Sequence, residues 1–211
     1  MATAQQLPKL VSVLVEHQQG FSSLSTEDAQ WAIKNPADVI ALACDAITKR
    51  TKSAVTALLA FVGSIVLPAT EKFVAEKNFT RGAGNIGWLG DNFKNWFLGK
   101  VEEPAAEAEL RYLTLTRASV DTPIISELGG EEKCEVALAH VFALIERQKT
   151  GNPGELLTSG YANIFYVRDV NATLRAVSAR WRAGRGYWGV GASPVGYPGV
   201  WGADYRVFSR K

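Results

Sequence analysis

Apolar residues recur at helical spacing in the N-terminal part of the chain and alternate with polar residues in the C-terminal part. The helical spacing predicts four short helices, over residues 7–18, 29–34, 36–47 and 51–61. The alternation predicts strands over 110–118, 174–182 and 188–192. We therefore expect an α+β fold, with a helical N-terminal region followed by a C-terminal helix-plus-antiparallel-sheet domain.

One amphipathic stretch precedes the C-terminal strands. A helix is predicted over 131–148, with a core-facing stripe of Cys134, Leu138, Val141, Phe142 and Ile145. Between 68 and 107 the pattern is weak, with a short strand at 71–75, a glycine-rich loop at 81–90 and a short helix at 91–98. That loop lacks the Lys-Ser/Thr pair that closes a phosphate-binding P-loop. The predicted organisation is a helical module (1–67), an irregular connecting region (68–107) and a mixed ligand-binding domain (108–211).

The alternation in the C-terminal strands separates two residue chemistries. In 174–182, one face carries Val177, Ala179 and Trp181, and the other carries Ser178, Arg180 and Arg182. Beyond the turn at 183–186, the apolar residues Trp188, Val190 and Ala192 alternate with Tyr187, Gly189 and Gly191. One face of this hairpin is thus a Trp/Val/Ala face, and the opposite face consists of Ser, Arg, Tyr and Gly.

The polar face has the composition of a binding surface. Although 47% of the chain is hydrophobic, as in ordinary globular proteins, residues 178–205 contain no Lys, Glu, Gln or Met, which leaves out the two commonest surface residues. Tyr, Ser, Gly and Arg instead dominate antibody paratopes. Asn codons of the form AAY that vary at both adenines give these same residues. We predict that Tyr187, Tyr197 and Tyr205 act as aromatic anchors and that neighbouring arginines make polar contacts.

The charge distribution leaves a second interpretation open. The net charge is only +2, but residues 151–211 hold eight basic residues against three acidic ones. Basic, aromatic-rich sheets can bind single-stranded nucleic acid by neutralising phosphates and stacking bases. The residues available for this are Arg168, Arg175, Arg180, Arg182 and Arg185, beside Tyr166, Trp181, Tyr187 and Trp188.

The sequence predicts neither catalysis nor a metal or cofactor. The two histidines, His17 and His140, have no partners at metal-ligand spacing, and no nucleophile accompanies a histidine and an acid. Cys44 and Cys134 are expected to be buried free thiols. The first residues show no signal-peptide pattern, from which we expect a cytoplasmic protein, and the longest apolar run (54–67) is too short for a membrane span.

The C-terminal residues carry a resemblance to a known family. The pattern Ala176-Val177-x-Ala179-x-Trp181, Trp188-x-Val190-x-Ala192-Ser193, Pro198-x-x-Trp201-x-Ala203 and Arg206-Val207-Phe208-Ser209-Arg210 resembles the variable proteins of diversity-generating retroelements, from uncultured bacteria. In such systems an error-prone reverse transcriptase rewrites a C-terminal region at template adenines. The rewritten side chains form a ligand-binding surface, commonly on a C-type-lectin-like fold. Two features depart from the pattern: the glycine-tryptophan core signature and Gly-Phe-Arg ending of many lectin-fold members are missing, and Pro194 stands at a scaffold position.

The resemblance implies a non-enzymatic binding protein whose variable segment spans 176–210. Its partner would be an unknown protein or glycan. The implied fixed scaffold is Trp181, Trp188, Val190, Trp201, Val207 and Phe208. The implied ligand-binding positions are Ser178, Arg180, Arg182, Arg185, Tyr187, Gly189, Gly191, Gly196, Tyr197, Gly199, Asp204 and Tyr205.

Overall fold

The computed structural model describes residue 12 and residues 24–211, and for 47–56 the backbone only. The chain divides into two compact units, Met1–Val55 and Thr56–Lys211. The boundary predicted after residue 67 therefore lies too far along the chain, because strand β1 (Leu59–Leu67) pairs with a strand of the second unit. The helix predicted over 7–18 lies outside the described residues, Ser12 excepted.

Two helices form the described part of the first unit. Helix α2 (Thr26–Lys34) begins after Ser25, whose hydroxyl accepts a hydrogen bond from the Asp28 amide at 3.1 Å. Helix α3 (Pro36–Thr56) is continuous where two helices, 36–47 and 51–61, were predicted. No glycine or proline interrupts residues 37–56, so nothing local breaks it. No helix in the described part of the chain is long and apolar enough to cross a membrane.

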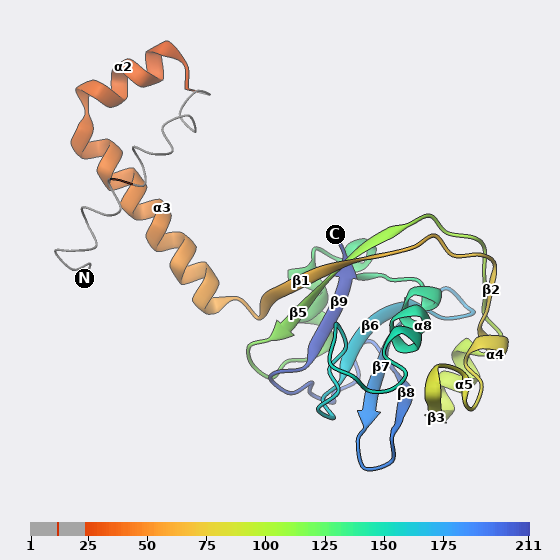
Figure 1. Cartoon of the computed structure of the whole chain (residues 1–211). Helices are drawn as coiled ribbons and strands as arrows, with labels where there is room; N and C mark the ends of the chain where they lie inside the picture. The colour runs from red at the N-terminus through yellow and green to blue at the C-terminus, as the bar shows by residue number, and fades with distance from the viewer. Residues whose placement is uncertain (1–11, 13–23) are drawn as a thin grey trace. The chain divides into compact units, whose positions relative to one another are not determined.

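The second unit is built on a seven-stranded mixed sheet, so the α+β class is confirmed (Figure 1). The strand order is β1-β5-β9-β6-β7-β8-β3, in which β3 is Ile86–Leu89, β5 is Ala108–Leu115, β6 is Asn163–Arg168, β7 is Leu174–Arg182, β8 is Tyr187–Pro194 and β9 is Arg206–Arg210. The prediction of an antiparallel sheet is wrong at two places. Strand β9 lies parallel to β6, and β3 lies parallel to β8, because both arrive from distant parts of the chain rather than through a hairpin.

The region predicted as an irregular connection, 68–107, belongs to this compact unit. It contains α4 (Ala75–Asn78), a 3-10 turn (Ala83–Asn85), α5 (Asp91–Phe97) and a separate two-stranded sheet of β2 (Phe73–Val74) and β4 (Val101–Glu102). Phe79, Phe93 and Phe97 are buried in the same cluster as the main sheet. The elements are too short to give a clear period, which is why the sequence pattern was weak.

The helix predicted over 131–148 is two helices, α7 (Glu131–Cys134) and α8 (Leu138–Arg147). Between them the chain is extended, and the Val136 amide donates to the Tyr166 carbonyl of β6 at 2.9 Å. Cys134 packs in the core on one face of the sheet, whereas the buried residues of α8 pack on the other face. The break lets the chain pass from one face to the other.

Each face of the sheet has its own apolar core. The first core joins α8 and α5 to the inward side chains of the hairpin, Val177, Ala179, Trp181, Trp188 and Val190. The second core packs α6 (Asp121–Leu128) against β5, β6, β9 and the first half of β7, including Leu174 and Ala176. It stops there, so the later residues of β7 on that face remain uncovered.

Glu102 in β4 caps α8 from a distance. Its two carboxylate oxygens accept hydrogen bonds from the Leu138 and Ala139 amides, both at 2.9 Å. We expect Glu102→Ala to lower the free energy of unfolding by about 1–3 kcal/mol, because two helix-terminal amides lose their acceptor. Urea denaturation measures this, with Glu103→Ala as the control, since Glu103 is exposed and forms only a 3.5 Å ion pair with Lys72. Equal losses in the two variants would contradict the capping role.

The two cysteines should react differently with thiol reagents. Both are free, but Cys44 is exposed, which corrects the prediction that both are buried. Burial raises the pKa of Cys134 to about 12, and Glu131 and Glu135 contribute in the same direction. We expect Ellman's reagent at pH 8 to modify Cys44 rapidly and Cys134 only after denaturant is added, because the thiolate is the reactive species. In Cys44→Ser the rapid phase should vanish, and a rapid phase that persisted would show that Cys134 is accessible.

Candidate functional site

Strands β7 and β8 present the predicted polar residues on one face of the sheet. Arg180 stands opposite Gly189 in the antiparallel register, Ser178 opposite Gly191, and Arg182 opposite Tyr187. Paired residues of neighbouring strands point to the same side. Because the second core ends at Ala176, this side lies outside the core from Ser178 onward, and Ser178 and Arg180 are half-buried there.

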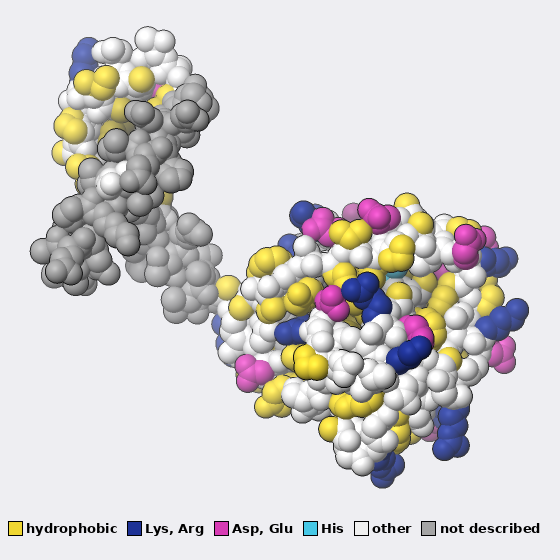
Figure 2. Space-filling model, in the orientation of Figure 1, with side chains coloured by type: hydrophobic (Ala, Val, Ile, Leu, Met, Phe, Trp, Pro, Cys, Tyr) yellow, Lys and Arg dark blue, Asp and Glu magenta, His cyan; other side chains and the backbone are white. Residues whose placement is uncertain are grey.

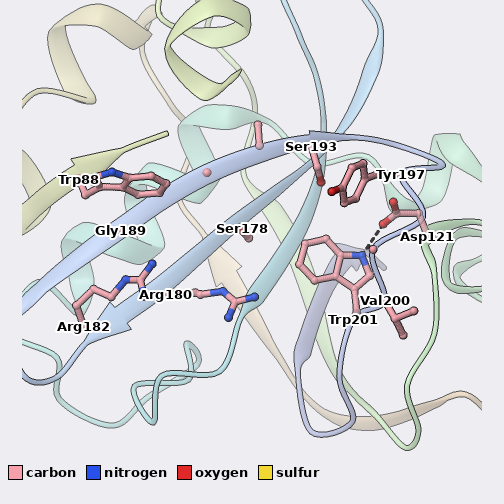
Figure 3. Close-up of a pocket in the computed structure, with 13 residues that line it drawn as sticks. Trp88, Asp121, Ser178, Arg180, Arg182, Gly189, Ser193, Tyr197, Val200 and Trp201 are labelled. Atoms are coloured by element: carbon pink, nitrogen blue, oxygen red, sulfur yellow. Dashed lines mark hydrogen bonds between the residues drawn. The ribbon is translucent and has the colours of Figure 1, made fainter. Parts of the chain in front are cut away.

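A pocket of about 320 Å³ opens on this face, beside the start of α6 (Figure 3). We call it the strand-face pocket. Its volume lies at the lower end of the range for small-molecule sites, roughly 300–1,000 Å³. Seven of the twelve predicted positions line it: Ser178, Arg180, Arg182, Gly189, Gly191, Tyr197 and Gly199.

One wall of the strand-face pocket is Trp88 from β3. Its ring lies against the two glycines of β8: a Cβ atom would come within 3.4 Å of the ring at Gly189 and within 3.6 Å at Gly191. The glycines thus leave room for an indole on the surface of the sheet. Trp88 is 48% exposed, so one face of the ring is available to a ligand.

The opposite wall comes from the loop that follows β8. Tyr197, Val200 and Trp201 lie here, beside Asp121 at the start of α6 (Figure 3). The loop is tied to the chain before α6, because Trp201 and Ser119 exchange backbone hydrogen bonds of 2.8 and 3.0 Å.

Asp121 links this wall to the core. The carboxylate is 1% exposed, and its Oδ1 accepts hydrogen bonds from Trp201 Nε1 at 2.7 Å and from the Tyr166 hydroxyl at 3.0 Å. Burial raises the pKa of Tyr166 far above its ordinary value, and the neighbouring Asp121 charge raises it further. Tyr166 therefore stays protonated and remains a donor at all physiological pH values.

The arginines of β7 supply the positive charge of the pocket. Arg180 Nη1 donates to the Tyr205 hydroxyl at 3.3 Å, and its guanidinium carbon lies 5.0 Å from the centre of the Tyr205 ring. The ion pairs among the described residues (12 and 24–211) do not include Arg180, Arg182 or Arg185. These guanidinium groups are therefore available to an anionic ligand.

The remaining predicted positions lie outside the strand-face pocket. Arg185 and Tyr187 line a neighbouring hollow with Trp88 and Arg182, and Arg185 Nη1 donates to the Tyr187 hydroxyl at 3.2 Å. Tyr205 contacts the Arg180 guanidinium through its hydroxyl and its ring. Gly196 and Asp204 occupy turns with φ of +87° and +66°.

The predicted scaffold is largely buried. Trp181, Trp188, Val190, Val207 and Phe208 are all at most 9% exposed, so their expected place in the core is confirmed. Trp201 differs, since it is half-buried and forms part of the pocket wall.

Sequence reasoning missed Trp88, Asp121, Ser193 and Val200. Trp88 lies in the predicted glycine-rich loop, where a single tryptophan between glycines was the one available signal. Asp121 comes from a helix start that the alternation of the C-terminal strands cannot reveal.

Comparisons with protein-family models, with curated proteins and with solved structures found no match. Within the described residues, no group of three His, Cys, Asp or Glu side chains is arranged to hold a metal ion. The function must therefore be inferred from the site itself.

Proposed function

We propose that this chain is a non-enzymatic ligand-binding protein that displays its binding surface on β7, β8 and the loop 194–204. The observation that carries the proposal is the division of the hairpin. Its alternate residues form a buried tryptophan-rich core on one side and, on the other, an open pocket of Arg, Ser, Gly and Tyr. Aromatic and arginine side chains dominate binding energy at interfaces.

We further propose that it is a variable protein of a diversity-generating retroelement with a C-type-lectin-like fold. The burial pattern supports this, because side chains that face the pocket can change without disturbing the core. At Gly189 and Gly191 an added Cβ would meet other atoms no closer than 3.3 Å, and the nearest belong to side chains that can move. The left-handed backbones at Gly196 and Asp204 favour Gly, Asn and Asp at those two positions.

The return of the last strand leaves one half of the sheet free for binding. Strand β9 enters between β5 and β6, and helices α6, α7 and α8 lie in the connection from β5 to β6. This arrangement brings both ends of the second unit into one half of the sheet and leaves the β6-β7-β8 meander, with its loops, to carry the binding surface.

Most of the side chains that single-stranded nucleic-acid binding would use are buried or already paired. Tyr166, Trp181 and Trp188 are buried and cannot stack on bases. Arg168 pairs with Glu131 and Glu135, and Arg175 pairs with Asp169. On the face in view in Figure 2, which carries α8 and lies opposite the strand-face pocket, basic and acidic side chains are interspersed without the continuous basic stripe that a nucleic-acid site needs.

A genomic comparison tests the diversification. We expect a near-repeat of the coding segment for 176–210 beside a reverse transcriptase gene, with differences only opposite template adenines. The differing codons should be those of the twelve proposed positions. Differences spread equally over the codons of Trp181, Trp188 and Phe208 would contradict the proposal.

Stability measurements test the division between surface and core. Arg180→Ala and Tyr187→Ala should change the free energy of unfolding by less than about 1 kcal/mol, as for surface substitutions. A loss of several kcal/mol from either would show that these residues hold the fold, and the proposed binding role would fall.

A further inference from the structure

The strand-face pocket joins unpaired positive charge to exposed aromatic rings. Arg180 and Arg182 lie along one side of it, and Trp88 stands at one end with Tyr197 and Trp201 at the other (Figure 3). Within the described part of the chain, the Arg182 side chain forms no hydrogen bond or ion pair, and Arg180 bonds only to the neutral Tyr205 hydroxyl. Arginines without a carboxylate partner at the edge of a pocket suit an oxyanion, which accepts paired N–H donors.

Pocket charge distinguishes among oxyanions. Two guanidinium groups face one carboxylate, Asp121, so the charge of the lining is +1. A carboxylate ligand, with one negative charge, balances this value, whereas a phosphate monoester carries about two negative charges at pH 7. The negative charge of Asp121 would repel the doubly charged phosphate monoester more strongly than the carboxylate.

The uncharged part of the pocket suits a flat ring. Trp88 is 48% exposed and Tyr197 55% exposed, and both offer aromatic faces to a ligand. Between them the floor is made of glycines and of the short Ser178 side chain, which leaves space close to the sheet. Offset stacking or edge-to-face contact between aromatic rings adds about 0.5–1.5 kcal/mol beyond burial alone.

We propose that the strand-face pocket binds a singly charged carboxylate attached to a flat, unsaturated ring. The carboxylate lies on Arg180 and Arg182, and the ring lies between Trp88 and Tyr197. Tyr205 acts as a positioning residue, because it holds the Arg180 guanidinium by a hydrogen bond and by its ring. The inference rests on the proposed ligand-binding role of this surface and adds the chemistry of the ligand.

Three probes that share the same naphthalene ring system test the inference by isothermal titration calorimetry on the full chain. They are 2-naphthoate, 2-naphthamide and 2-naphthyl phosphate. We expect 2-naphthoate to bind at least tenfold more tightly than the neutral amide and more tightly than the phosphate. Cyclohexanecarboxylate, which keeps the charge but not the flat ring, should bind at least fivefold more weakly than 2-naphthoate.

Variants locate the binding. Arg182→Ala should weaken 2-naphthoate at least fivefold and leave 2-naphthamide unchanged, and Trp88→Ala should weaken both. Arg147→Ala is the matched control, since it removes an exposed arginine from α8, on the other face of the sheet, and should change neither. Arg182 is the informative arginine because its side chain forms no hydrogen bond or ion pair with the other described residues, and the melting temperature of each variant verifies the fold.

Several results would overturn the inference. These are equal binding of acid and amide, tightest binding of the phosphate, binding that Arg182→Ala does not change, and no binding of 2-naphthoate at its solubility limit. None of them touches the proposed ligand-binding role, which fails instead if the pocket variants unfold the protein or if the genomic repeat differs in its core codons.

Discussion

Replacing Trp188 with alanine is expected to lower the free energy of unfolding by about 3–5 kcal/mol, the largest effect of any substitution considered for this chain. Trp188 is fully buried, and its ring meets Trp181 edge-on with centroids 5.3 Å apart. Its Nε1 donates to the Gln148 carbonyl at 2.9 Å, at the end of α8. The substitution therefore leaves a large cavity and removes one of the two hydrogen bonds that the Gln148 carbonyl accepts, the other coming from the Gly151 amide at 2.9 Å.

Trp88→Ala is the matched control for this prediction. The same side chain is removed from the neighbouring strand, but on the opposite, open face of the sheet. We expect a loss below about 1 kcal/mol. Urea denaturation followed by circular dichroism measures both variants. Equal losses would mean that the pocket face is as much part of the core as the buried face.

Asp121→Ala is expected to cost about 2–3 kcal/mol. The change removes the acceptor of two donors at once, the Tyr166 hydroxyl in the core and Trp201 Nε1 in the pocket wall. A buried donor left without an acceptor costs about 1–3 kcal/mol, and the half-buried Trp201 recovers part of its loss by bonding to water. The loop that carries Trp201 should also become more mobile, which amide hydrogen exchange at 197–201 would detect.

Asp121→Asn separates the hydrogen bonds from the charge. Both donors bond to Oδ1, and asparagine keeps an oxygen at that position. The asparagine variant should therefore lose no more than about half of what the alanine variant loses. If the two variants lose the same, the negative charge matters for stability and the hydrogen bonds do not.

Local alternation was sufficient to predict the two faces of the hairpin. Side chains alternate between the two faces of any strand, whatever lies beside it. Trp181, Trp188 and Val190 could therefore be placed in the core before any neighbour was known. The same local reasoning failed for 131–148. There a continuous stripe concealed the extended break at Val136, which exists because β6 offers it a backbone partner.

The strand-face pocket was predictable only in part for the same reason. Ser178, Arg180, Gly189 and Gly191 follow from the register of one hairpin. Trp88 and Asp121 reach the pocket from segments about 100 and 60 residues earlier, through a parallel pairing and a helix start that no local pattern encodes. Long-range contacts of this kind need the tertiary structure.

The short strand β3 has a consequence for the proposed variable surface. Without it, β8 would be the last strand of the sheet, with a free row of backbone donors and acceptors beside the side chains proposed to vary. Such an edge can recruit strands from other molecules, and each new combination of residues would be a fresh aggregation risk. Because β3 pairs with β8 from Ile86 to Leu89, part of that backbone is satisfied whatever side chains β8 carries. The proposed variable surface could thus change its side chains while part of the β8 backbone stays paired.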